Sequence, residues 1–146
     1  MNLKDIEYIP ISRVCTVERA VSGKIYREGT CFVKLSAVDE EVGQLKEAGK
    51  IESRYAALEP KEGVDPDYLL VTVENAFPEF LRKYRTTLNL QADTLEHFVI
   101  PWHKEQEARK YVVDCMRFIN GNIDRANTMI EQEKQLKDWY LSKMMV

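Results

Sequence analysis

Apolar side chains follow a helical spacing over the last third of the chain. From Ala108 to Ile130 they recur at steps of three or four residues, which places them on one stripe of a helix. The stripe consists of Ala108, Val112, Cys115, Ile119, Ile123, Ala126 and Ile130. Charges of both signs fill the positions between them, as is typical of a helix held along one contact line. The pattern predicts one long helix over residues 101–146 that pairs with another helix as a coiled coil.

The apolar positions move to another face of this helix near its end. They continue there as Met129, Leu136, Trp139, Tyr140 and Met144. Trp139 and Tyr140 have two interpretations. They pack on the chain's own domain or on a second copy, since aromatic residues dominate such contacts. Alternatively they form a docking surface for a different protein, since interfaces are rich in Trp and Tyr.

Residues 1–100 alternate short strand-like and helix-like segments. Strands are expected where β-branched and aromatic residues gather, and helices where Asp or Pro can open the first turn. The expected elements up to residue 59 are a helical turn at 11–15, a strand at 16–21, a turn at Ser22-Gly23, a strand at 30–35, a helix at 39–48 opened by Asp39 and closed by Gly49, and a strand at 54–59.

The rest of this region begins with the clearest helix start in the chain. Asp65 can accept a hydrogen bond from the first turn, and Pro66 has a φ angle already fixed for a helix. The expected elements are a helix at 66–75, a second helix from Pro78 to residue 85, and a strand at 95–100 that stops at Pro101. The sequence thus predicts an α+β fold: a small mixed domain at 1–100, followed by a long coiled-coil helix at 101–146.

Length and composition suit one compact domain with an appendage. The chain has 146 residues, of which 45% are hydrophobic. No apolar run approaches the roughly 18 to 20 residues of a membrane-spanning helix, and the first ten residues do not resemble a signal peptide. A cytoplasmic protein without a membrane partner is expected. Cys15, Cys31 and Cys115 lie in apolar stretches without metal-binding spacing, which predicts buried thiols and no disulfide.

Charge excludes a strongly basic nucleic-acid-binding domain. Residues 1–100 carry 13 Lys and Arg against 17 Asp and Glu, and residues 101–146 carry 8 against 7, for a net charge of −3. Because phosphate neutralisation supplies most nonspecific DNA affinity, DNA binding would require a few well-placed cations or those of a partner. The densest basic cluster is Arg82, Lys83 and Arg85. It is also explained as a solvated helix end, where cations face the negative pole of the dipole.

Candidate catalytic and metal-binding groups are sparse. His97 and His103 lie six residues apart around a strand and a proline, and they share no helix face with carboxylates. The six glycines are scattered singly, so no phosphate-binding loop is formed, and no Ser-His or Cys-His pair has a local signature. The sequence predicts no catalytic residue, no metal and no cofactor, and hence a protein that is not an enzyme.

Three segments, in their order and spacing, resemble the specificity subunit of type I restriction-modification systems, and the resemblance spans nearly the whole chain. The first is ISRVCTVERAVSGKIYREGT with its Gly23-Lys24 turn, the second holds the helix start Asp65-Pro66-Asp67-Tyr68-Leu69, and the third holds Ile100-Pro101, Glu105-Gln106, Leu136-Lys137, Leu141, Lys143 and Met144. One departure is Trp102-His103-Lys104, where the family has several prolines. This departure puts the shape of the entry to the long helix in doubt.

The resemblance implies half of a complete subunit. A complete specificity subunit carries two target-recognition domains and two such helices packed antiparallel, whereas this chain carries one of each. A two-fold homodimer through the helix would hold two identical domains a fixed distance apart over a two-part DNA site. The expected dimer residues are Val112, Cys115, Ile119, Ile123, Ala126 and Ile130.

The resemblance also implies the partners. They are double-stranded DNA, a methyltransferase subunit that methylates adenine with S-adenosylmethionine, and a translocating restriction subunit, while the chain itself performs no catalysis. Bases would be recognised by side chains that reach the DNA grooves. The candidate DNA-binding residues are Lys24, Tyr26, Arg27, Lys34, Arg54, Arg82, Lys83 and Arg85, and the candidate residues for docking the methyltransferase are Trp139 and Tyr140.

Two other classes of function stay open on sequence alone. A regulatory or decoy half-subunit would bind the partner subunits tightly without recognising a DNA site. An unrelated coiled-coil interaction module would be indifferent to both DNA and a methyltransferase.

Overall fold

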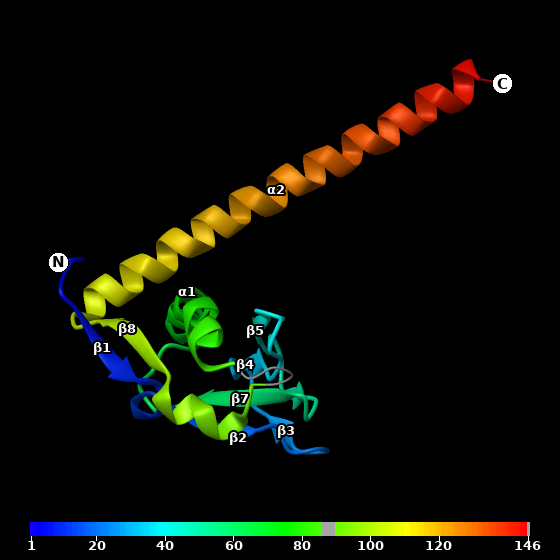
Figure 1. Ribbon diagram of the computed structural model, residues 1–146. Coiled ribbons are helices and arrows are strands. Elements are labelled where there is room, and N and C mark those ends of the chain that lie inside the picture. The colour runs from blue at the N-terminus through cyan, green and yellow to red at the C-terminus, as the bar shows by residue number, and fades with distance from the viewer. Residues whose placement is uncertain (86–89, 146) are drawn as a thin grey trace. The chain divides into compact units, whose positions relative to one another are not determined.

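The structure is a computed structural model that describes residues 1–85 and 90–145. The chain divides into two units, Met1–Lys110 and Tyr111–Val146. The elements are β1 (Ile6–Pro10), the 3₁₀ turn η1 (Ile11–Arg13), β2 (Cys15–Arg19), β3 (Ile25–Tyr26), β4 (Cys31–Lys34), β5 (Val42–Gln44), β6 (Gly49–Lys50), β7 (Tyr55–Pro60), α1 (Pro66–Tyr84), the 3₁₀ segment η2 (Ala92–His97), β8 (Val99–His103) and α2 (Gln106–Met144). The predicted α+β fold with a long C-terminal helix is confirmed (Figure 1).

A four-stranded antiparallel sheet, in the order β2-β7-β4-β5, forms the centre of the first unit. Leu58 of β7 pairs with Val17 of β2 on one side and with Cys31 of β4 on the other. Leu58, Cys31 and Val33 are fully buried. The Cys31 Sγ lies 3.9 Å from the Pro66 carbonyl of α1, so this face of the sheet is the one that α1 covers.

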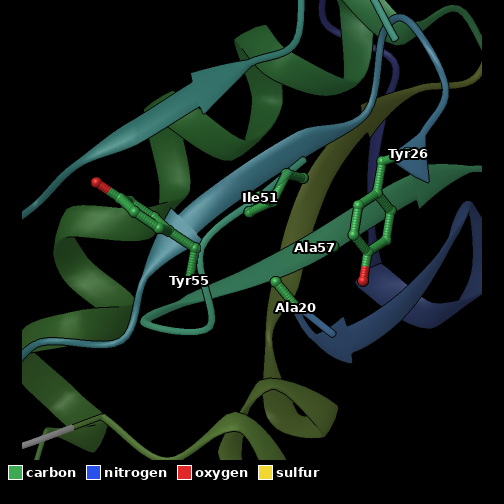
Figure 2. Close-up of a cluster of buried hydrophobic side chains, with 5 residues drawn as sticks. All are labelled: Ala20, Tyr26, Ile51, Tyr55 and Ala57. Atoms are coloured by element: carbon green, nitrogen blue, oxygen red, sulfur yellow. The ribbon is translucent and has the colours of Figure 1, made fainter. Parts of the chain in front are cut away.

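The opposite face of the sheet packs on β3 and on residues that flank β2 and β6 (Figure 2). The cluster consists of Ala20, Tyr26, Ile51, Tyr55 and Ala57, with Phe32 and Leu45 packed against it. Figure 2 shows the two tyrosine rings at either end of the cluster and the smaller side chains between them. The hydroxyl of Tyr26 donates to Glu18 at 2.8 Å and that of Tyr55 to Glu41 at 2.9 Å. Both rings are therefore buried while their polar ends reach carboxylates.

β1 and β8 form a separate antiparallel ribbon that packs against α1 (Figure 1). Ile100 and Trp102 point inward and are buried, whereas Tyr8 points outward and is 75% exposed. The Tyr68 ring of α1 meets the Trp102 ring edge-on, with centroids 4.7 Å apart. The Tyr68 hydroxyl accepts a hydrogen bond from the His103 N–H at 2.8 Å. Aromatic packing and this hydrogen bond together fix the ribbon on the helix.

The start of α1 agrees with the prediction. The Asp65 carboxylate accepts a hydrogen bond from the Asp67 N–H at 2.9 Å, and Pro66 is the first helical residue. Gly29 lies against this turn with a φ of +88°, and a Cβ there would lie 2.9 Å from the Pro66 side chain. Glycine at position 29 thus permits both the left-handed backbone and the close approach to the helix start.

The predicted break between residues 75 and 78 is wrong, because α1 is one 19-residue helix with Pro78 inside it. Pro78 removes one internal hydrogen bond, which normally kinks or ends a helix. Here Val73, Phe77 and Leu81 are buried on both sides of the proline. Packing of this apolar face holds the two halves in one helix despite the local propensity.

The predicted helix at 39–48 is wrong as well, because Val42–Gln44 forms β5 at the edge of the central sheet. Gly43 lies directly opposite Phe32, and a Cβ at this position would overlap the Phe32 ring. Glycine is also a poor helix former. Gly49, expected to close the helix, is not left-handed and begins β6 instead.

The predicted strand at 95–100 is displaced toward the C-terminus. η2 occupies 92–97, and β8 continues through Pro101 to His103. The His103 N–H points to Tyr68, away from β1. Pro101 lies two residues earlier in β8, so its backbone nitrogen faces the same way as that of His103. The missing N–H of Pro101 therefore removes nothing from the ladder. The long helix accordingly begins at Gln106 and not directly after Pro101.

The remaining predicted elements are confirmed with small shifts of their ends: the turn at 11–15, the strands at 16–21, 30–35 and 54–59, and the turn at 22–23. β1, β3, β5 and β6 were not predicted. β3 and β6 have two residues each and β5 has three, which is too short for a clear period-2 pattern. Across residues 1–85 and 90–145, none of the helices combines the length and apolarity that a membrane crossing requires.

Gly43→Ala is expected to lower the free energy of unfolding by about 1 to 3 kcal/mol, because overpacking a filled site costs about that much. The matched control is Gly49→Ala, where the nearest atom to a Cβ would be a backbone oxygen 3.9 Å away. Urea unfolding followed by circular dichroism compares both variants with the wild type. Equal stability of the two variants would contradict this account of β5.

Candidate nucleic-acid interface

Cations gather at the end of the central sheet where β7 begins. Arg19 ends β2 and Lys34 ends β4, and the antiparallel register pairs both with the first two residues of β7. Arg54 immediately precedes β7. α1 ends at the same place, because the Arg85 guanidinium donates to the Ala37 carbonyl in the loop after β4 at 3.2 Å. We call this surface the basic end and define it by Arg19, Lys34, Arg54, Arg82, Lys83 and Arg85.

Acidic side chains offset part of the charge of the basic end. Lys34 forms ion pairs with Asp39 at 2.7 Å and with Glu41 at 3.8 Å. Its hydrogen bond to Asp39 raises the pKa of the Lys34 ammonium. Arg54 forms an ion pair with Glu52 at 2.8 Å. Lys34 and Arg54 must therefore exchange these carboxylates for phosphate or base oxygens if they contact DNA.

Arg82 and Lys83 have a different environment. Both are exposed in the last turn of α1. Within the part of the chain that the structure describes, no carboxylate forms an ion pair with either of them. The Lys83 ammonium lies 5.4 Å from the centroid of the Tyr84 ring, which stacks on the His97 ring. These two cations are available to a phosphate without the loss of an existing ion pair.

The other three DNA-binding candidates lie elsewhere in the domain. The Glu18 carboxylate of β2 accepts hydrogen bonds from Lys24 at 2.6 Å and from Tyr26 at 2.8 Å. Both bonds lower the pKa of Glu18, with the Lys24 bond the larger cause. Tyr26 is only 1% exposed, so its side chain is part of the core. Arg27 pairs with Glu59 at 3.4 Å, near the opposite end of β7.

The structure thus brings five of the eight DNA-binding candidates together at the basic end, namely Lys34, Arg54, Arg82, Lys83 and Arg85. It places Lys24, Tyr26 and Arg27 elsewhere. Arg19 joins the five although the sequence did not single it out. It donates to the Ser53 carbonyl at 2.8 Å, next to Arg54. Its place depends on the register between β2 and β7, and no local pattern in the sequence gives that register.

Two open grooves lie on the same unit. One, of about 710 Å³, follows β2 and faces η2, and the other, of about 450 Å³, lies at the start of α1. The first is lined in part by Thr16, Glu18, Arg19, Lys61 and Asp93. Within the described residues, no group of three or more His, Cys, Asp or Glu side chains is placed to hold a metal ion. Neither groove gathers groups that would indicate a reaction.

Cys15, Cys31 and Cys115 are free thiols. Cys15 and Cys31 are buried, and burial raises the pKa of each thiol to about 12. Cys115 on α2 is only half-buried, which differs from the prediction of a fully buried thiol. Its position on the predicted seam explains the difference, because burial there would require a second helix.

The predicted seam of α2 is an uncovered apolar stripe. Ile119, Ile123 and Ile130 are 47%, 52% and 50% exposed. Ala126 is exposed, and Val112 is half-buried. Farther along, the Trp139 and Tyr140 rings meet edge-on with centroids 5.0 Å apart, and both are more than half exposed. This helix carries apolar surface that its own chain leaves in contact with water.

Comparison with solved structures identifies the fold. The S (specificity) subunit of a type I restriction-modification system from M. genitalium matches over 94% of this chain, with a TM-score of 0.77 and 11% sequence identity. The chain has the fold of a type I specificity subunit. A chain from a structure of an assembled type I system matches over 89% (TM-score 0.67, 18% identity), and the HsdS subunit from Thermoanaerobacter tengcongensis over 84% (TM-score 0.57, 16% identity).

The specificity-subunit fold confirms the structural part of the resemblance found in the sequence. The chain spans 45%, 43% and 40% of the lengths of these three solved chains, which is less than half of each. No protein-family model and no curated protein matches the sequence. The DNA-binding, dimer and docking residues stay predictions.

Proposed function

We propose that this chain recognises a DNA sequence as half of a specificity subunit. Two copies, paired through α2, would hold two recognition domains over a two-part site and position a methyltransferase subunit on it. The supporting observation is the 39-residue α2, whose apolar stripe is uncovered, joined to a domain of the specificity-subunit fold. Two copies of the chain would together supply the two domains and two helices that the family combines in one subunit.

The energy available from the stripe sets the scale of this pairing. Fully burying an isoleucine side chain contributes about 1.5 to 3 kcal/mol. Ile119, Ile123 and Ile130 are about half exposed in each copy. The six isoleucines of a dimer would therefore contribute about 5 to 9 kcal/mol. This amount is comparable to the loss of translational and rotational freedom on association, about 4 to 15 kcal/mol, so a stable dimer needs contacts beyond the stripe.

The basic end is the proposed DNA-binding surface. Arg82 and Lys83 would contact phosphates, because they are exposed and lie at the end of a helix. Arg19, Arg54 and Arg85 would reach base edges, since a guanidinium can bind guanine in a bidentate way. The net charge of −3 means that these few cations act together with those of a partner. Lys24, Tyr26 and Arg27 are not part of this proposed surface.

Under this proposal the partner subunits would perform catalysis, and the chain would direct them to a particular DNA sequence. The test is co-expression of the chain with the methyltransferase subunit of its own source, followed by sequencing that maps methylated adenines. The expected result is methylation at a palindromic two-part site with a fixed gap, which disappears when the chain is omitted. Methyltransferase binding without methylation would instead indicate a regulatory or decoy half-subunit. Neither binding nor methylation would indicate an unrelated coiled-coil module.

Lys83→Ala is expected to weaken binding of the chain–methyltransferase complex to duplexes of any sequence, and to lower the slope of log affinity against log salt by about one. The matched control is Lys46→Ala, an exposed lysine after β5 at the other end of the sheet. Fluorescence anisotropy at several salt concentrations measures both quantities. The basic end is not the DNA-binding surface if the two variants behave alike.

Ile119→Asp combined with Ile123→Asp is expected to weaken self-association at least 100-fold, because four carboxylates would lie in the centre of the seam. Both side chains are about half exposed in the single chain, so the fold is expected to survive. Asn120→Asp, on a polar face of the same turn, is the matched control. Sedimentation equilibrium measures the dissociation constant, and a double variant that stays dimeric would refute pairing through this stripe.

A further inference from the structure

The apolar stripe of α2 is symmetric about position 119 of the chain. Cys115 and Ile123 lie four residues on either side of this position, Val112 and Ala126 lie seven, and Ala108 and Ile130 lie eleven. A two-fold axis at this level in an antiparallel pair would set Ile119 beside Ile119 of the second copy, Ile123 beside Cys115, and Ala126 beside Val112. A parallel pair would not require this symmetry, because each residue would then face its own equivalent.

This register leaves the end of each helix without a helical partner. Gln132 would be level with Gln106, where the second copy's α2 begins. Residues 133–144 would extend about 18 Å beyond that point, at 1.5 Å per residue. The last two turns of this extension carry Trp139, Tyr140 and Met144, which are 54%, 52% and 70% exposed. In the second copy, the element that immediately precedes Gln106 is β8.

The β1–β8 ribbon has an uncovered apolar face. Strand alternation places Ile6, Tyr8 and Pro10 of β1 on one side, paired with His103, Pro101 and Val99 of β8, and all of these except His103 are apolar or aromatic. We call this set the outer face of the ribbon. Tyr8 is its most exposed member at 75%, and Val99 is 47% exposed. The opposite side of the ribbon, with Ile9, Ile100 and Trp102, is buried.

About 50 Å of continuous helix separates Gln106 from Trp139, which follows it by 33 residues. A second copy running in the opposite direction would bring its last turns to the start of the first copy's α2, which β8 precedes. Both surfaces are apolar and exposed, and their contact would supply the additional burial that the stripe needs.

We infer that the outer face of the β1–β8 ribbon is the docking site for the last two turns of α2 from a second copy. The inference rests on the proposed dimer and specifies it. Trp139, Tyr140 and Met144 of one copy cover Tyr8 and Val99 of the other. The contact occurs twice by symmetry, anchors each helix end on the opposite recognition domain, and fixes the register of the seam.

The first test replaces Tyr140 with the photoreactive p-benzoylphenylalanine in the full chain. Equal amounts of ¹⁵N-labelled and unlabelled protein are mixed and irradiated, and crosslinked peptides are identified by mass spectrometry. The expected product joins Tyr140 to the tryptic peptide 5–13, which contains Tyr8, with mixed isotope labels. The same substitution at Asp138, on a polar face of the same turn, is the control and should not give this product. A crosslink to the end of the second copy's α2 would overturn the inference.

The second test is Tyr8→Lys, expected to raise the dissociation constant of the dimer at least tenfold. It would bury a lysine near Lys143 of the second copy. The matched control is Val38→Lys in the loop after β4, because Val38 is 77% exposed and not on the ribbon. Tyr8→Phe, which keeps the ring, should dimerise like the wild type. Equal dissociation constants for the two lysine variants would overturn the inference.

The failures of the two proposals are distinguishable by sedimentation equilibrium of the wild type. A chain that stays monomeric at the highest concentration refutes the dimer and the docking contact together. A dimer that lacks the Tyr140 crosslink to peptide 5–13 and tolerates Tyr8→Lys refutes only the docking contact. A dimer that forms this crosslink and is weakened by Tyr8→Lys supports both.

Discussion

Burial of β7 on both faces is the constraint on which the fold of the first unit depends. Leu58 points to α1, while Tyr55 and Ala57 point into the opposite cluster. A strand covered on both sides must carry small or apolar residues at successive positions, and YAALEP meets this requirement until Glu59. The pairing of β7 with β2 and β4 then fixes where those strands end. The position of every cation of the basic end follows from this, either through strand register or through the contact of Arg85 with the loop after β4.

Elements with strong local signals could be predicted from the sequence, and elements held by distant contacts could not. Asp65 and Pro66 specify a helix start through their own chemistry, and β4 and β7 are rich in strand-forming residues. The helix predicted at 39–48 failed because edge pairing with β4 outweighs a weak local preference. The break at Pro78 failed for a related reason, since buried residues on both sides of the proline hold the helix together.

The candidate site shows the same division between residues with a local sequence signal and residues placed by distant contacts. The cluster Arg82, Lys83 and Arg85 is contiguous in sequence, so it could be found there. Arg19 joins it only through the register of two strands separated by 35 residues or more, which the sequence does not display. Tyr26 had a local motif around it, but its ring lies in the core at 1% exposure. The motif around Gly23-Lys24 thus located the turn correctly, but it did not show which side chains near the turn are exposed to water.

An uncovered stripe on a long helix is costly for a single chain and useful for a pair. A single contact line of three isoleucines per copy yields roughly what association costs, so the pairing of helices alone would be weak and its register poorly fixed. In the proposed dimer, a second contact at each helix end would change this, because a shift by one turn would move Trp139 about 5 Å from its position on the ribbon and misplace the seam at the same time. The two contacts would therefore reinforce a single register. A fixed register sets one distance between two recognition domains, and a protein that recognises a two-part site with a gap of one length requires such a distance.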